Sequence, residues 1–143
     1  IWGHSMGGGI TIRVITVDSG IRAAVLYAAM NADERLNHEQ RRVWSGGREI
    51  EPLDVPEADL ERIAPVGYLG RITAAVSIHH STDDATVPVE WSDALCARLR
   101  ELGKDVECYT YSGVPHTFSG ALDAVFMERY IAFFDRYLRL PDA

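Results

Sequence analysis

Close to its start the chain reads Gly3-His4-Ser5-Met6-Gly7, and the other elements can be placed relative to this segment. It has the pattern Gly-x-Ser-x-Gly, which is typical of a sharp turn from a strand into a helix with the serine at its apex. We expect a side chain at Gly3 or Gly7 to collide with the neighbouring strand or helix, because only glycine allows so close an approach. Such a turn lifts the Ser5 hydroxyl clear of the sheet. It also places the Met6 N–H at the helix N-terminus, where it would stabilise an oxyanion.

The pattern alone does not specify one kind of site, because glycine and serine are common in ordinary loops. By itself it leaves Ser5 open as a nucleophile and, equally, as a loop or helix-cap residue. A serine hydroxyl is a weak nucleophile at neutral pH, so it needs a histidine as base and a carboxylate that orients that histidine. In this type of site the serine comes first in the chain, followed by Asp or Glu and then by His.

The composition is that of one ordinary soluble domain: 143 residues, 47% hydrophobic and 24% charged. The formal net charge of -7 argues against nucleic acid or a membrane surface as the main partner, because either needs a basic face. No apolar run approaches the roughly 18 residues of a transmembrane helix. The sequence leaves the oligomeric state open.

Two cysteines, Cys96 and Cys108, are too few for a disulfide framework, and we expect them to be reduced, partly buried thiols. Their spacing fits no metal site, so no metal is expected. No signal-peptide pattern is present. Because the chain begins at Ile1 and not at methionine, the compartment stays open, with the cytoplasm weakly favoured.

Apolar segments of strand length alternate with segments of helical period. The first helix carries Ile10, Val14 and Val17 near one face. The last helix carries a wide apolar stripe, which we expect to pack against the sheet. We expect helices over residues 6–17, 33–45, 57–64, 90–102 and 121–140, and strands over residues 23–29, 72–80 and 106–111.

Residues 31–70 form a charged, proline-punctuated excursion between two strands, with a loop at Gly46 and Gly47. The charges by themselves indicate only a solvated face. The excursion is therefore either a plain exposed insertion or a lid or pocket wall, and the two interpretations are compatible.

The alternation predicts an α/β fold with a mainly parallel sheet flanked by helices. In such sheets, functional residues collect at the C-terminal ends of the strands. Ser5, the pair Asp83 and Asp84, and His116 each follow a strand or the position where one should end. This coincidence is the main physical argument for a catalytic site.

The histidine of the site is predicted to be His116, the one histidine that follows a candidate acid in a suitable loop. His4 is expected to pack near the turn, and His38 lies in the polar excursion. His79 and His80 end a strand, and we interpret them as packing or loop residues. The residues alone do not decide between the two aspartates, although neighbouring side chains in an extended segment point in opposite directions.

Several segments together resemble the α/β-hydrolases, and within them the prolyl oligopeptidase and dienelactone hydrolase-like group. Residues 3–8 look like that group's turn around the nucleophile. Residues 80–88, His-Ser-Thr-Asp-Asp-Ala-Thr-Val-Pro, are similar to its acid loop His-Gly-x-x-Asp-x-x-Val-Pro. Residues 113–118 resemble its histidine loop Gly-x-x-His-x-Phe, and residues 64–69 resemble its Ser-Pro-x-x-Tyr-Leu segment.

The resemblance implies Ser5 as nucleophile, His116 as general base and then acid, Asp84 as the orienting acid, and the Met6 N–H as one oxyanion donor. Such chemistry needs no cofactor. Dienelactone hydrolases carry cysteine as the nucleophile, so the serine favours a peptidase or an esterase acting on a small peptide or ester.

The resemblance also implies that residues 1–143 are the C-terminal part of a catalytic domain whose N-terminal half is absent. We then expect about three parallel strands, with no strand leading into Ser5 and an exposed apolar edge at residues 23–29. Alone, such a piece would be poorly stable and nearly inactive. The favoured function is a prolyl oligopeptidase-like serine peptidase. The alternatives are a carboxylesterase and, from another class, a non-catalytic α/β-hydrolase-like binding domain.

Overall fold

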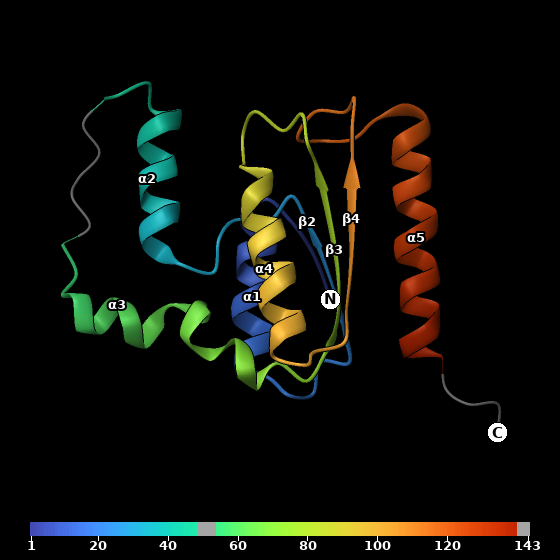
Figure 1. The fold of residues 1–143 in the computed structure, drawn as a ribbon, viewed down its shortest axis with the longest axis horizontal. Helices are drawn as coiled ribbons and strands as arrows, with labels where there is room; N and C mark the ends of the chain where they lie inside the picture. The colour runs from blue at the N-terminus through green and yellow to red at the C-terminus, as the bar shows by residue number, and fades with distance from the viewer. Residues whose placement is uncertain (49–53, 140–143) are drawn as a thin grey trace.

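The computed structural model describes residues 1–48 and 54–139, and within them a four-stranded parallel sheet lies between helices (Figure 1). The spatial order of the strands is β1-β2-β3-β4, the same as their order in the chain. Figure 1 shows α1 and α4 on one face of the sheet and α5 on the other, with α2 and α3 to the side. The elements are β1 (Trp2–His4), α1 (Met6–Val17), β2 (Ala23–Tyr27), α2 (Glu34–Trp44), α3 (Glu57–Ile63), the 3-10 helix η1 (Pro65–Arg71), β3 (Ala75–Ser81), α4 (Val89–Glu101), β4 (Val106–Tyr111) and α5 (Gly120–Leu138).

The expected α/β fold with a parallel sheet is therefore confirmed. Each predicted helix and strand is present within a few residues of its expected ends, although residue 140 of the last helix lies outside the described residues. The segment η1 was not expected as a separate element. Within the excursion, the loop at Gly46 and Gly47 is observed, with positive φ at both residues. Residues 49–53 of the excursion lie outside the described part.

A strand leads into Ser5 after all. β1 is only three residues long, and it pairs in parallel with β2, so that Gly3 lies opposite Leu26. The Val25 N–H also donates a hydrogen bond to Ile1 O, at 3.0 Å. The expectation of about three strands was wrong, because three residues are enough to form a strand when the neighbouring strand supplies their hydrogen-bond partners. β2 is buried along its whole length and does not form the exposed edge that we expected.

Two hydrophobic clusters fill the two faces of the sheet. On one face α5 contributes Phe126 and Phe133, which are almost fully buried. Burial of a side chain of that size contributes about 1.5–3 kcal/mol. On the other face the first helix buries Ile12 and Ile15. The apolar face noted from the sequence is not the buried one: Ile10 and Val17 are 57% and 77% exposed. The buried residues of the helix are Gly8, Thr11, Ile12, Ile15 and Thr16.

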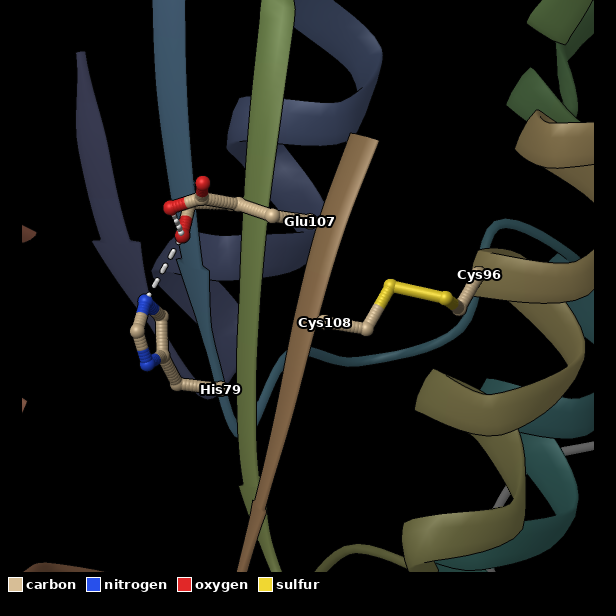
Figure 2. Close-up of a disulfide and its surroundings, with 5 residues drawn as sticks. His79, Cys96, Glu107 and Cys108 are labelled. Carbon is tan, nitrogen blue, oxygen red and sulfur yellow. Dashed lines mark hydrogen bonds between the residues drawn. A yellow bond between two sulfur atoms is a disulfide. The ribbon is translucent and has the colours of Figure 1, made fainter. Parts of the chain in front are cut away.

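The two cysteines form a disulfide, which corrects the expectation of free thiols. Cys96 on α4 and Cys108 on β4 are joined across 12 positions of sequence, with Cα atoms 6.4 Å apart. Figure 2 shows the bond on one side of β4, while Glu107 and His79 point to the other side. The bond joins the edge strand to the helix that covers it.

None of the helices in residues 1–48 and 54–139 has both the length and the apolar character needed to span a membrane.

Candidate active site

Ser5 occupies a strained backbone position between β1 and α1. Its φ of 55° and ψ of -118° are rare for a residue with a side chain. Hydrogen bonds hold this conformation on both sides. The Ser5 N–H donates to Tyr27 O at 2.9 Å, and the Met30 N–H donates to Ser5 O at 3.0 Å. Tyr27 is the last residue of β2 and Met30 lies in the segment that follows it, so the end of the neighbouring strand and the residues after it fix the turn.

Glycine is required at two places around this turn. A Cβ atom on Gly3 would lie 2.3 Å from Gly7 O, and one on Gly8 would lie 2.5 Å from the Ala29 Cβ. A Cβ on Gly7 would meet nothing within 4 Å, so the expectation that Gly7 avoids a collision was wrong. The helix approaches the chain after β2 through Gly8, a residue that the Gly-x-Ser-x-Gly pattern does not include.

Met6 is the first residue of α1, directly after Ser5. The N–H groups of a first helical turn have no acceptor within the helix and point along the positive end of its dipole. The Met6 N–H is therefore available to an anion formed beside the Ser5 hydroxyl. The Met6 side chain is 72% exposed and leaves this position open to solvent.

Asp84 and His116 are in direct contact although they are 32 positions apart. The Nδ1 atom of His116 lies 2.7 Å from Oδ2 of Asp84, whose side chain is fully buried. The other oxygen, Oδ1, accepts the N–H groups of Thr86 at 2.8 Å and Val87 at 2.9 Å. Asp83 turns away and accepts the Gly113 N–H at 2.6 Å. The structure thus separates the two aspartates that the sequence left open.

Burial by itself would raise the pKa of the Asp84 carboxyl. The hydrogen bond from His116 and those from the Val87 and Thr86 backbone outweigh it, and the net pKa of Asp84 lies below its usual value. The carboxylate is therefore ionised near neutral pH and can only accept. It follows that Nδ1 of His116 carries the proton, and that Nε2 of a neutral His116 has a free lone pair.

Ser5 and His116 lie on loops at the same edge of the sheet, because the strands before them are parallel. His4 links the two loops. Its Nε2 donates to His116 O at 3.1 Å, and its ring stacks on Tyr27 with centroids 4.2 Å apart, which fits its expected packing role. Among the described residues no hydrogen bond joins the Ser5 hydroxyl to His116, so the predicted triad is in direct contact only at its acid and histidine.

One neighbour of Asp84 and His116 was not predicted from the sequence. His80 lies at the end of β3, and its Nε2 lies 3.0 Å from Oδ2 of Asp84. His80 was expected to pack or to bond within a loop, and the available signal was its position four residues before Asp84 in the acid loop.

A cavity of about 300 Å³ lies beside the turn. Met6, Gly9 and Met30 line it, and Asn37 and Arg41 of α2 line it as well. The excursion thus contributes to a pocket wall next to the proposed oxyanion donor. Its helix is also tied to the acid loop, because Trp44 Nε1 and Gln40 Nε2 each donate to Thr86 O at 2.8 Å. Within the described ranges no group of three or more His, Cys, Asp or Glu side chains is arranged to hold a metal ion.

The sequence matches the family model of the prolyl oligopeptidase family over residues 1–140. A comparison with curated protein sequences gives no match.

Several solved structures have a similar fold. A puromycin-hydrolyzing peptidase of Mycobacterium tuberculosis is 25% identical, with a TM-score of 0.83 over 99% of this chain and 22% of that protein. An acylaminoacyl peptidase of Pyrococcus horikoshii is 19% identical, with a TM-score of 0.82 over 100% of this chain and 24% of that one. A protein from Klebsiella pneumoniae assigned as a dienelactone hydrolase is 19% identical, with a TM-score of 0.67 over 96% and 51%. These similarities confirm the expected α/β-hydrolase fold. The chain spans about a quarter of the length of the two peptidases.

Proposed function

Because this chain belongs to the prolyl oligopeptidase family, we propose that it carries the catalytic triad of a serine hydrolase that cleaves a peptide bond through an acyl-enzyme. Ser5 is the nucleophile, His116 is the general base and then the general acid, and Asp84 orients His116. The Met6 N–H is one oxyanion donor. The observation that carries the proposal is the 2.7 Å hydrogen bond between His116 and the buried Asp84 carboxylate, at the same sheet edge as the strained turn of Ser5.

In the first half of the reaction, Ser5 Oγ attacks the substrate carbonyl carbon while its proton passes to Nε2 of His116. The Met6 N–H donates to the resulting oxyanion, and such a donor contributes about 100- to 1,000-fold in turnover. The intermediate collapses, the bond to the leaving amine breaks, and the amine takes the proton from His116. Asp84 stabilises the imidazolium that exists between these two transfers.

In the second half, a water attacks the acyl carbon and gives a proton to Nε2 of His116. The bond to Ser5 Oγ breaks, and the serine recovers the proton. Every proton transfer therefore passes through Nε2 of His116. Only the proton on Nδ1 stays in place, and the ionised Asp84 holds it there.

Two features support a substrate that lies across the turn. The cavity beside Met6 offers a pocket with polar groups from α2 and apolar groups from Gly9 and Met30. The peptidases with similar structures are hydrolases of amide bonds by their names, which favours a peptide over an ester.

Hydrolysis by the full-length protein tests the proposal. We expect cleavage of a blocked peptide anilide and also of an activated short ester, because the triad acts on both acyl groups. Ser5→Ala and His116→Ala should each lower kcat by several orders of magnitude. Turnover of the ester with no cleavage of a panel of peptides would reassign the protein as an esterase. Equal hydrolysis by wild type and Ser5→Ala would refute the triad.

A further inference from the structure

Two adjacent histidines at the end of β3 are both buried, and they point to opposite faces of the sheet. His79 is 0% exposed and His80 is 1% exposed. His79 bonds to Ser77 Oγ and to the Tyr111 hydroxyl, each at 2.8 Å. His80 faces Asp84 instead. Both side chains are buried to the same degree and hydrogen-bonded at both ring nitrogens, but only His80 contacts a residue of the proposed site.

The hydrogen bonds of His80 fix its tautomer. Nε2 lies 3.0 Å from Val87 O, which can only accept, so Nε2 carries the proton. The same N–H reaches Oδ2 of Asp84 at 3.0 Å. Nδ1 is then the acceptor, and Ser92 donates its hydroxyl to it at 2.6 Å. Burial lowers the pKa of His80 despite the neighbouring Asp84, so the ring is neutral and acts as a donor at Nε2.

Asp84 is thus held from four directions. Oδ1 receives two backbone N–H groups of its own loop, from Thr86 and Val87. Oδ2 receives one N–H from His80 and one from His116. The first three donors belong to the protein framework, and the fourth belongs to the proposed base. Without His80, Oδ2 keeps only the bond from His116 itself, and the two backbone N–H groups hold the carboxylate at Oδ1 alone. Oδ2 can then move together with the His116 ring.

We propose that His80 is a positioning residue. Its Nε2–H holds Oδ2 of Asp84 where that oxygen accepts from Nδ1 of His116, and the Ser92 hydroxyl of α4 in turn holds the His80 ring. The proposal rests on the function proposed above, because it treats Asp84 and His116 as parts of the reacting system. His80 touches neither substrate nor Ser5 in this arrangement. It acts through Asp84 on the direction of the His116 ring.

The proposal predicts a loss of turnover and not of substrate binding. Misplacement of a catalytic group by about 1 Å can cost about 100-fold. In the full-length protein, His80→Leu should therefore lower kcat by about 10- to 100-fold and leave KM within about twofold. His80→Gln keeps a donor and an acceptor on one planar group, so it should recover most of that loss.

The matched control is His79→Leu, which removes a histidine of the same burial from the other face. We expect it to lower stability as much as His80→Leu does, while kcat per folded molecule stays near that of wild type. If both leucine variants lose kcat equally, or if His80→Gln is as slow as His80→Leu, His80 has only a structural role and the proposal is wrong.

A spectroscopic measurement tests His80 independently of turnover. The His116 Nδ1 proton, which is shared with a buried carboxylate, should give a low-field proton resonance that Asp84→Asn removes. We expect His80→Leu to shift or broaden this resonance and His79→Leu to leave it in place. An unchanged resonance in His80→Leu overturns the positioning role. A changed resonance in a protein that hydrolyses neither peptide nor ester would refute the proposed function and leave the positioning of Asp84 standing.

Discussion

Asp84 and His116 meet through a 2.7 Å hydrogen bond between Oδ2 and Nδ1, and the Asp84 end of this bond is completely buried. The contact sets the tautomer of the histidine, because an ionised carboxylate accepts only from an N–H. It also leaves Nε2 as the one ring atom of His116 that can receive a proton. The chemistry proposed for Ser5 depends on this assignment.

Replacement of Asp84 by asparagine should therefore be severe. An asparagine amide can donate to Nδ1 and stabilise the wrong tautomer, and the equivalent change in a protease triad lowers kcat by about 10⁴-fold. We expect a loss of that order in the full-length protein, measured as kcat on a peptide anilide. The control is Asp83→Asn, which changes the adjacent carboxylate that bonds to Gly113. If Asp83→Asn is the slower variant, Asp84 is not the acid.

Gly8 and Gly7 should respond in opposite ways to alanine. The new methyl at position 8 would meet Ala29 at 2.5 Å, and a steric conflict of this kind typically costs about 1–3 kcal/mol. At position 7 the methyl meets nothing, so the higher helix propensity of alanine should stabilise the protein by up to about 1 kcal/mol. Urea unfolding of the two variants measures both effects. Equal destabilisation would contradict the packing of α1.

Loss of the Cys96–Cys108 disulfide should destabilise the protein by about 3 kcal/mol, because the unfolded chain regains the freedom of the closed loop. The double variant Cys96→Ala, Cys108→Ala should unfold at lower urea concentration than the oxidised protein. The reduced wild type should behave like the variant. Two free thiols in the protein as purified, titrated with a thiol reagent after denaturation without reductant, would show that the bond is absent.

The buried His79 should make stability fall with acid. Burial, reinforced by the nearby Arg129, lowers its pKa to about 3. Between pH 6.5 and pH 3 the unfolded chain binds a proton that the folded protein does not, so the free energy of unfolding rises with pH in this window. The contribution of His79 should be complete above about pH 6.5 and smaller by about 3 kcal/mol at pH 4.5.

The variant His79→Gln isolates that contribution. It lacks the titrating ring, so its unfolding free energy should depend less steeply on pH between 4.5 and 6.5 than that of wild type. The two curves should converge toward low pH. Parallel curves over this range would mean that His79 binds its proton equally in the folded and unfolded chains.

Much of the fold followed from the sequence. The apolar stripe of α5 has a helical period. The apolar runs of β2 and β3 are continuous, and the alanines of β2 also permit a helix, so the flanking turn residues and Asn31 favoured a strand there. The order of strands and helices then placed the loops of Ser5, Asp84 and His116 at one edge. The choice of Asp84 over Asp83 came from the resemblance of its loop to a family motif, because two neighbouring aspartates have the same local chemistry.

Other features depend on contacts that no local pattern encodes. Cys96 and Cys108 look like isolated thiols until α4 packs over β4. The glycine that matters for close packing is Gly8, since the collision that it avoids involves Ala29 from another element. His80 was hidden for a similar reason. In a strand buried on both faces, neither burial nor alternation shows which of two histidines faces the acid.

Covalent labelling of the full-length protein with a fluorophosphonate, followed by mass spectrometry of the modified peptide, tests the proposed nucleophile most directly. We expect the phosphonyl group on Ser5, no labelling of Ser5→Ala, and a reaction of His116→Ala that is slower by at least about 1,000-fold. Modification of another residue, or equal labelling of wild type and Ser5→Ala, would show that Ser5 is not the nucleophile.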